Sequence, residues 1–188
     1  RQLNRWKDLI GLNFQLAINV SYRDISGPYL PIIVQEAIRE FEVGPECLIL
    51  EITESGLLSG EQDPVNILNE IRGLGCDIAL DDFGTGYSSL SYLRHLPVDE
   101  IKVDRSFILD LVENKSARHI IEAISKLGKT LNMQITAEGI ETLDQLRTGI
   151  DLGCDFAQGA LFSMPLPEAE FTDILENKRE PNWDQIFQ

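Results

Sequence analysis

Short apolar runs alternate with amphipathic stretches along the whole chain. Six of the runs are continuous or nearly so, which is typical of strands covered on both faces in a parallel sheet. Between them, apolar side chains recur at steps of three and four residues, as on one face of a helix. Strands are therefore expected at 14–20, 47–52, 76–80, 100–103, 133–137 and 154–157.

The helices carry boundary signals of their own. Leu30, Val34 and Ile38 share one helix face, and Thr142 and Gln145 have the spacing of a capping box. Further helices are expected after Asp63-Pro64 as far as Gly73, from the cap Ser116 to Leu131, and from Glu168 to about Asn177. Strand and helix alternate without a linker, so the pattern predicts one α/β domain over residues 1–178, followed by a tail or linker at 179–188.

Polar side chains at the strand ends distinguish between two α/β architectures. A doubly wound open sheet gathers its ligand at one switch point, whereas a (β/α)8 TIM-type barrel collects residues from many strand ends. All six predicted strands end in or near such groups, which favours the barrel. They are Asn19, Glu51, Glu54, Asp81, Asp82, Lys102, Asp104, Glu138 and Gln158.

The strand count is two short of a closed barrel. Barrels of this type have about 250 residues, so we expect roughly 60 residues of the barrel to lie outside this sequence. We therefore expect about two strands and most of one helix to precede Arg1. The isolated 188-residue chain should then be impaired, because an incomplete barrel exposes strand edges and core surface.

Composition narrows the range of partners. The chain has 31 acidic and 16 basic residues, a formal net charge of -15, which argues against a DNA or RNA polymer or an anionic membrane as the main partner. An anionic ligand held through divalent cations remains compatible with this charge. Cys47, Cys76 and Cys154 lie far apart beside apolar runs, which predicts buried free thiols and a cytoplasmic location.

Adjacent aspartates form the strongest local signal. Asp81 and Asp82 end a strand and precede Gly84 and Gly86, so two carboxylates stand beside a tight glycine loop. Such hard oxygen ligands select Mg2+ or Mn2+, and two ions can share them. A solvated acidic turn is the alternative for this pair. Glu51 lies inside an apolar strand and therefore needs a cation, either a metal ion or a basic side chain.

Most of the remaining strand-end residues have more than one possible role. Glu54 is placed to anchor the glycine loop, and Asn19 is either a neutral metal ligand or a turn former. Lys102 alternates with apolar neighbours and points to the side opposite them, where it orients water or phosphate, or pairs with Asp81 or Glu138. Glu138 binds a metal ion, holds the attacking water, or pairs with Lys102.

Together these groups favour one reaction class. Several carboxylates, an amide and a lysine, with no nucleophilic triad, fit two-metal hydrolysis of a phosphoester and fit acyl transfer poorly. A metal-dependent barrel that acts on carbon acids is a weaker alternative, because the double aspartate with its glycine loop argues against it.

Six motifs in chain order resemble those of the EAL-domain family. They are Asn19-Val20-Ser21, Leu50-Glu51-Ile52-Thr53-Glu54, Asp81-Asp82-Phe83-Gly84-Thr85-Gly86, Ile101-Lys102-Val103-Asp104, Ala137-Glu138-Gly139-Ile140-Glu141 and Gln158-Gly159. The resemblance implies a (β/α)8 barrel that hydrolyses the bacterial second messenger cyclic dimeric GMP to linear pGpG with two Mg2+ or Mn2+ ions.

The resemblance also implies roles for individual residues. Asn19, Glu51 and Asp81 correspond to ligands of one metal ion, with Asp81 bridging to a second ion that Asp82 and Glu138 support. Lys102 corresponds to the lysine that positions the attacking water, and Glu54 to the anchor of the glycine loop. Asp104 and Gln158 correspond to residues that contact the substrate.

Two departures from the family pattern leave a second hypothesis open. The Glu-Ala-Leu signature is absent and should precede Arg1, and Ala160 stands where an aromatic residue is common. A catalytically inactive receptor for cyclic dimeric GMP, or a dimerisation module, is therefore the alternative to an enzyme. The resemblance further implies a homodimer through residues 87–96, within a larger signalling protein that can be tethered to a membrane.

Overall fold

The computed structural model describes residues 2, 5–6, 14–58, 64–86 and 90–177. The expected tail at 179–188 and the first part of the expected dimer segment, residues 87–89, lie outside the described residues. All six predicted strands and the main predicted helices fall within the described part, so the predicted element order can be compared directly.

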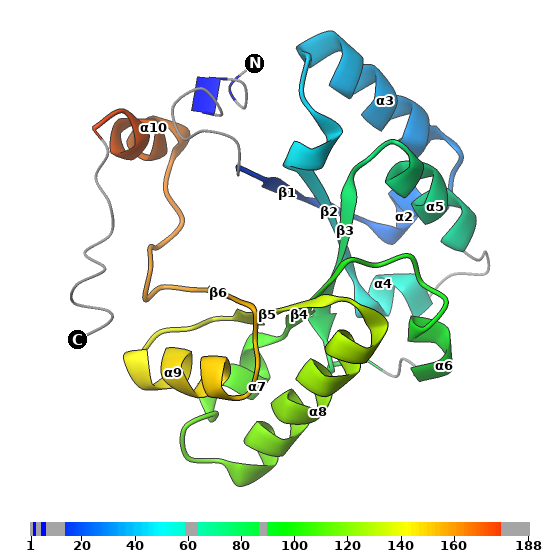
Figure 1. Ribbon diagram of the computed structural model, residues 1–188. Helices are drawn as coiled ribbons and strands as arrows, with labels where there is room; N and C mark the ends of the chain where they lie inside the picture. The colour runs from blue at the N-terminus through cyan, green and yellow to red at the C-terminus, as the bar shows by residue number, and fades with distance from the viewer. Residues whose placement is uncertain (1, 3–4, 7–13, 59–63, 87–89, 178–188) are drawn as a thin grey trace.

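Within the described residues, six parallel strands form a single sheet in chain order. Each strand after β1 pairs with the strand that precedes it in the chain. Each connection between paired strands is a crossover that contains at least one helix. The sheet curls along its length (Figure 1). The strands, each close to its predicted position, are β1 (Leu16–Val20), β2 (Leu48–Thr53), β3 (Asp77–Phe83), β4 (Glu100–Val103), β5 (Gln134–Glu138) and β6 (Phe156–Gln158).

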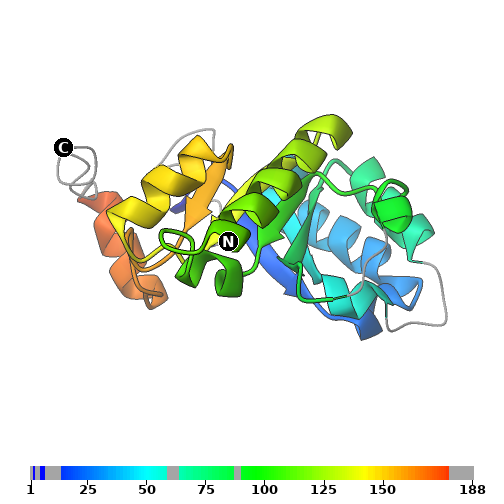
Figure 2. The same cartoon turned by 90° about the horizontal axis from the view of Figure 1, so that it is seen from below.

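Helices lie around the convex side of the curled sheet (Figures 1 and 2). The capping box of Thr142 and Gln145 is confirmed, but the cap of the longest helix was predicted two residues too late. Asn114 Oδ1, and not the side chain of Ser116, accepts hydrogen bonds from the first backbone N–H groups. The described helices are α2 (Tyr22–Ile25), α3 (Tyr29–Phe41), the 3-10 turn η1 (Pro45–Cys47), α4 (Glu54–Leu58), α5 (Val65–Gly73), α6 (Leu90–Leu93), α7 (Arg105–Leu109), α8 (Lys115–Leu131), α9 (Leu143–Asp151) and α10 (Glu168–Glu176).

The core lies between the sheet and these helices. Apolar side chains on the convex face of the central strands, such as Ile78, Ile101 and Ile135, are fully buried. The edge strands differ, because Ile18 on β1 and Phe156 on β6 are 43% and 52% exposed. The expectation of strands covered on both faces is therefore correct for β2 to β5 and wrong for β1 and β6.

The described sheet is open. No pairing between β1 and β6 occurs among the described strands, so the parallel α/β architecture is present while closure into an eight-stranded barrel stays a prediction. Cys47 and Cys76 are buried, as expected, and Cys154 is half-buried. None of the helices in the described ranges combines the length and apolar composition needed to cross a bilayer.

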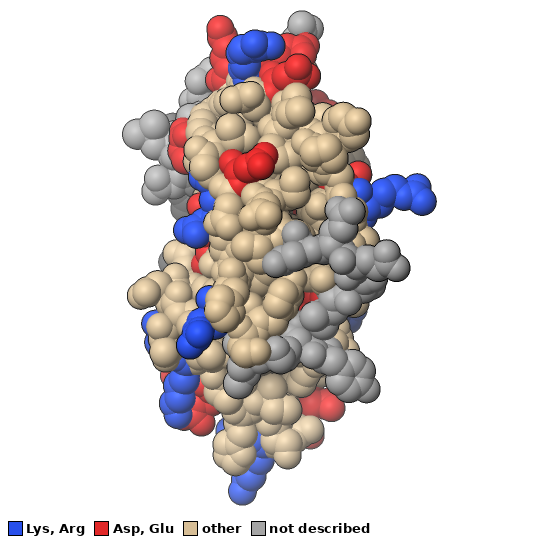
Figure 3. Space-filling view, turned by 90° about the vertical axis from the view of Figure 1, so that its right-hand side faces the viewer, with Lys and Arg blue, Asp and Glu red and all other residues tan. Residues whose placement is uncertain are grey.

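Charge is unevenly distributed over the surface. Figure 3 shows the side of the molecule that carries α3, α5 and α6 in Figure 1, and a broad band of uncharged residues crosses it. Tyr29 and Ile33 on α3 are 70% and 59% exposed. A chain of net charge -15 thus has one side on which charged groups are sparse.

Candidate active site

Strand register brings the predicted site residues onto one face of the sheet. Residues directly opposite each other in a sheet share a face. Asn19 lies opposite Glu51 on β1 and β2, and Glu138 lies opposite Gln158 on β5 and β6. Thr53, two residues after Glu51, lies opposite Asp81, so the polar groups of five strands, β1, β2, β3, β5 and β6, share the concave face at the carboxyl ends.

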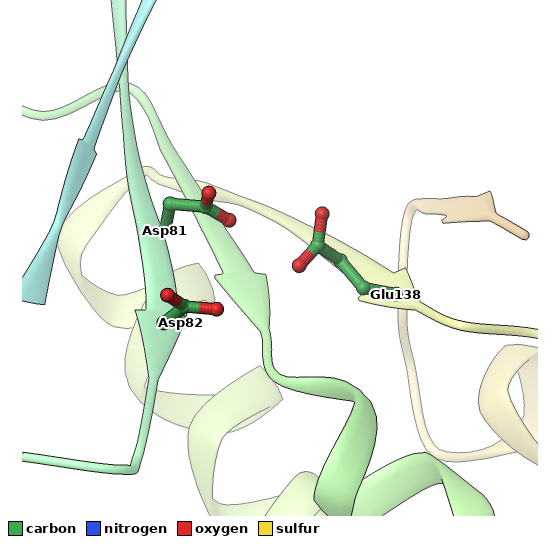
Figure 4. Close-up of side chains that lie close together, drawn as sticks. All are labelled: Asp81, Asp82 and Glu138. Atoms are coloured by element: carbon green, nitrogen blue, oxygen red, sulfur yellow. The ribbon is translucent and has the colours of Figure 1, made fainter. Parts of the chain in front are cut away.

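A bulge in β3 explains how adjacent aspartates reach the same site. Leu80 pairs with Ile101 and Phe83 with Val103, so two residues of β3 oppose the single residue Lys102 of β4. Asp82 takes a left-handed conformation, with φ of 54°. A regular strand would send Asp81 and Asp82 to opposite faces, whereas the bulge lets both carboxylates turn towards Glu138 (Figure 4).

Lys102 lies at the centre of three carboxylates. Its Nζ atom is 2.5 Å from Glu51 Oε1, 2.7 Å from Glu138 Oε1 and 3.3 Å from Asp81 Oδ1. The residue is only 4% exposed, so the ammonium group depends on these partners. The expectation that Lys102 pairs with Asp81 or Glu138 is borne out, with Glu51 as a further partner.

The cluster shifts the pKa values of its members. The Glu138 and Glu51 carboxylates outweigh the desolvation that opposes the charge, and they raise the pKa of Lys102 above its usual value. Burial raises the pKa of Glu138 to about 7, against the opposing effect of Lys102. Burial and the neighbouring Asp81 charge raise the pKa of Asp82. Carboxylates crowded in this way favour an additional cation.

The side chains fit divalent metal ions. Ligand oxygens of Asp81, Asp82 and Glu138 lie within 4.8 Å of one another. Asp81 Oδ1 is buried and, among the described residues, has the Lys102 ammonium as an ion-pair partner at 3.3 Å but accepts no aligned hydrogen bond, so its lone pairs can also bind a cation. Hard carboxylate oxygens are the ligands preferred by Mg2+ and Mn2+. We call Glu51, Asp81, Asp82 and Glu138 the carboxylate centre.

Glu54 anchors the glycine loop, as the sequence suggested. Its Oε2 atom accepts hydrogen bonds from the backbone N–H groups of Gly84, at 2.8 Å, and Gly86, at 3.2 Å. Gly84 has φ of 99°, a conformation that favours glycine. Glu54 is 2% exposed and begins α4, directly after the strand that carries Glu51. The loop that follows the aspartates is therefore tied to the neighbouring strand.

The expected substrate contacts lie at the rim. Asp104 caps α7 by accepting a hydrogen bond from Ser106 N at 3.0 Å. Gln158 is exposed at the end of β6 and lines a cleft of about 870 Å³. Asn19 is exposed at the other end of the row. The structure thus gathers the carboxylate centre with Lys102, and places Asn19, Asp104 and Gln158 around it.

Two features of this region were missed from the sequence. Arg105, which lines the cleft, forms an ion pair with Glu141 across the ends of β4 and β5. Its position directly after Asp104, at a strand end, was a signal that could have identified it. Glu100, two residues before Lys102, and Thr136, directly opposite Lys102 on β5, lie on the same face as Lys102 and are joined by a hydrogen bond. Glu100 begins a short strand, where a charged residue usually indicates only a solvated edge.

The arrangement defines a class of protein: a parallel α/β domain with a carboxylate and lysine centre at the carboxyl ends of its strands. Sequence comparison identifies the family. The family described as EAL domain matches residues 1–165, so the chain belongs to the EAL-domain family. The prediction made from the six motifs is confirmed.

Named relatives agree with this assignment. The bifunctional diguanylate cyclase/cyclic di-GMP phosphodiesterase MucR of Pseudomonas aeruginosa is 40% identical over 89% of this chain and 24% of its own length. The structure of the MucR phosphodiesterase in complex with c-di-GMP superposes with a TM-score of 0.85 at 38% identity, over 90% of this chain and 69% of that one.

A more distant solved structure contains a metal ion as well. The manganese and c-di-GMP complex of Klebsiella pneumoniae BlrP1 has a TM-score of 0.80 at 28% identity, over 89% of this chain and 42% of that one. The chain spans between a fifth and a quarter of the length of several of its curated relatives, such as MucR at 24% and NbdA of Pseudomonas aeruginosa at 21%.

Proposed function

We propose that this domain hydrolyses cyclic dimeric GMP to linear pGpG with two Mg2+ or Mn2+ ions. The observation that carries the proposal is the carboxylate centre around Lys102, in which ligand oxygens of Asp81, Asp82 and Glu138 lie within 4.8 Å of one another and a single ammonium group faces Glu51, Asp81 and Glu138. Relatives described as cyclic di-GMP phosphodiesterases support the choice of substrate.

The positions of the side chains support a role for each of them. Asn19, Glu51 and Asp81 would hold one ion, and Asp81, Asp82 and Glu138 the other. When bound, such ions polarise a phosphodiester and lower the pKa of a water molecule. The Lys102 ammonium donates hydrogen bonds that orient this water and stabilises the charge that develops on phosphate. Glu138 would hold the second ion and accept a hydrogen bond from this water.

The rim residues would position the substrate. Gln158 lines the cleft, and Asp104 caps α7 directly before the cleft residue Arg105. Both side chains would offer hydrogen-bonding groups to a guanine or ribose. Glu54 contributes by holding the glycine loop next to Asp82. Each of these residues would help to orient the substrate relative to the ions and the water. Correct orientation lowers the activation barrier.

Turnover of cyclic dimeric GMP by the protein that contains this domain tests the proposal. The expected result is linear pGpG formation with Mg2+ or Mn2+, no product with a chelator, and a loss of orders of magnitude in Asp81→Asn. Thermal unfolding verifies that this variant is folded. Tight binding of nucleotide that stays intact would contradict hydrolysis and favour the alternative of a receptor.

We also propose the setting in which the domain works. Two further strands would close the curled sheet into an eight-stranded barrel, as the partial coverage of the MucR phosphodiesterase suggests. The domain would belong to a larger, cytoplasmic signalling protein. Folding of this chain alone, with full activity, would contradict the need for those strands.

A homodimer is the proposed assembly, through the segment at 87–96 that includes α6. The sparsely charged side in Figure 3 carries α6, so two acidic chains can meet there with little repulsion. Sedimentation velocity should show a dimer that Arg94→Glu weakens. The control Arg147→Glu, an exposed arginine on α9, should leave it intact. A monomeric wild-type protein would contradict the dimer.

A further inference from the structure

Gln145 is a buried amide that joins the loop after β5 to the end of α7. It is 6% exposed and lies in the first turn of α9, where it forms the capping box with Thr142. Its Oε1 atom accepts hydrogen bonds from the backbone N–H groups of Glu141, at 2.8 Å, and Thr142, at 3.0 Å. Its Nε2 atom donates hydrogen bonds to the carbonyl oxygens of Ile108, at 3.2 Å, and Leu109, at 3.5 Å. Both acceptor positions and both donor positions of the amide are therefore used.

The amide of Gln145 does more than the capping box of α9 requires. A capping box needs only an acceptor at this position, so glutamate serves as well as glutamine. A carboxylate would also interact more favourably with the N-terminus of the helix. The NH2 group has its partners on α7, and a carboxylate has no hydrogen to donate to them. The amide therefore points to the link with α7.

The short helix α7 lies between two loops that follow strands of the site. On one side, Phe107 packs on the glycine loop so closely that a Cβ at Gly84 would lie 2.7 Å from Phe107 Cε2. On the other side, a Cβ at Gly139 would collide with the Arg105 side chain. Glu54 anchors the glycine loop separately. A displacement of α7 would therefore act mainly on its contact with the loop after β5.

The ion pair of Arg105 and Glu141 forms the part of the cleft wall that depends on this contact. Both side chains line the cleft of about 870 Å³ that also contains Gln158. They are 59% and 42% exposed, and exposed ion pairs contribute little to holding two segments together. Gln145 instead holds both backbones, because it bonds to Glu141 N and to the helix that begins with Arg105. A guanidinium and a carboxylate on this wall offer a donor and an acceptor to a ligand in the cleft.

We propose that Gln145 is a positioning residue that holds α7 against the loop after β5 and thereby places Arg105 and Glu141 on the wall of the substrate cleft. The inference rests on the proposed function, because it takes cyclic dimeric GMP as the ligand of the cleft. Gln145 acts through Arg105 and Glu141. It should therefore affect substrate affinity and leave the carboxylate centre unchanged.

Kinetics of the protein that contains this domain test the inference. Gln145→Glu keeps both acceptor bonds but turns a carboxylate oxygen towards the carbonyls of Ile108 and Leu109. The end of α7 should move away, and KM for cyclic dimeric GMP should rise about tenfold. Both kcat and the Mn2+ affinity, measured by calorimetry, should stay within about twofold of wild type. Arg105→Met, a change of an exposed side chain, should raise KM to a similar extent.

A double variant separates positioning from packing. If Gln145 acts through Arg105, adding Gln145→Glu to Arg105→Met should raise KM by no more than about twofold. Thr142→Val is the matched structural control, because it removes the bond from Gln145 N to Thr142 Oγ1 and leaves the side-chain amide in place. It should lower the unfolding temperature and keep KM within about twofold of wild type. Independent effects of the two changes on KM, or an equal rise of KM in Thr142→Val, would overturn the inference.

The outcomes distinguish this inference from the proposed function. Binding of cyclic dimeric GMP that stays intact in wild type would defeat hydrolysis, and the dissociation constants of the same variants would still decide the role of Gln145. Wild-type turnover with an unchanged KM in Gln145→Glu would overturn the inference alone. If that variant does not fold, an unchanged KM in Arg105→Met would do the same. Absence of both binding and turnover in wild type would overturn both.

Discussion

Replacement of Lys102 by methionine tests the electrostatics of the site most directly. The ammonium group has three carboxylate partners at 2.5, 2.7 and 3.3 Å, and its side chain is 5% exposed. Methionine fills a similar volume, so Lys102→Met removes the charge while largely conserving packing. Glu51, Asp81 and Glu138 are then left as neighbouring carboxylates without a cation.

The expected loss of stability in the metal-free protein is substantial. Removal of one partner of a buried ion pair costs about 3–5 kcal/mol, because the remaining charge is desolvated and unpaired. The loss should become smaller as the pH falls, because burial raises the pKa of Glu138 and removal of Lys102 raises it further, so Glu138 can take up a proton in the variant. Divalent ions supply the missing positive charge, so saturating Mg2+ should remove most of the difference from wild type.

Urea unfolding measures both effects. Free energies of unfolding are compared for wild type and Lys102→Met, with a chelator and with saturating Mg2+. Lys126→Met is the matched control: its partner Glu122 is 2.6 Å away on the surface of α8, and its loss should have little effect in either buffer. A loss in Lys102→Met that is the same with and without Mg2+ would refute the reasoning.

Three further perturbations address the loop, the backbone and the pH dependence. Glu54→Gln weakens the hydrogen bonds to Gly84 and Gly86, so kcat should fall at least about tenfold; unchanged kcat would contradict an anchoring role. Gly84→Ala should cost about 1–3 kcal/mol in urea unfolding, since φ is 99° and the new Cβ would lie 2.7 Å from Phe107 Cε2. Gly73→Ala, with no atom within 4 Å, should not destabilise; equal effects of the two changes would contradict this account. Burial raises the pKa of Glu138 from 4.5 to about 7, so its contribution to metal-free stability is fully present below pH 4.5 and is lost as pH rises through 7. Unfolding free energies in chelator should therefore decline from pH 5 to 8 relative to Glu138→Gln, and parallel curves would contradict the shift.

The sequence predicted the strands well because each apolar run is short and bounded by turn residues. The predicted run at 100–103 coincides with β4, and the run at 133–137 differs from β5 by one residue at each end. The residue that caps the start of a helix was harder to predict when two suitable residues lie close together. Asn114 and Ser116 are both good caps, and only the backbone conformation decides that Asn114 accepts the hydrogen bonds.

Site residues at strand ends were predictable because parallel strands bring their carboxyl ends to one edge. Glu51, Asp81 and Glu138 therefore meet around Lys102, as a shared edge requires. The exposure of β1 and β6 was not predictable, because the apolar sequence of a strand does not reveal whether the strand lies at an edge of the sheet. Glu100 was missed for a related reason, since a charge at the start of a run resembles a solvated edge.

The bulge in β3 breaks the regular alternation of side chains between the two faces of the sheet. Alternation predicts that only one of two adjacent aspartates faces the site, yet Asp81 and Asp82 both turn towards Glu138. The extra residue opposite Lys102 and the left-handed Asp82 make this possible. A carboxylate pair that can share two ions thus depends on a local break in the sheet, and the anchored glycine loop that follows holds the break in place.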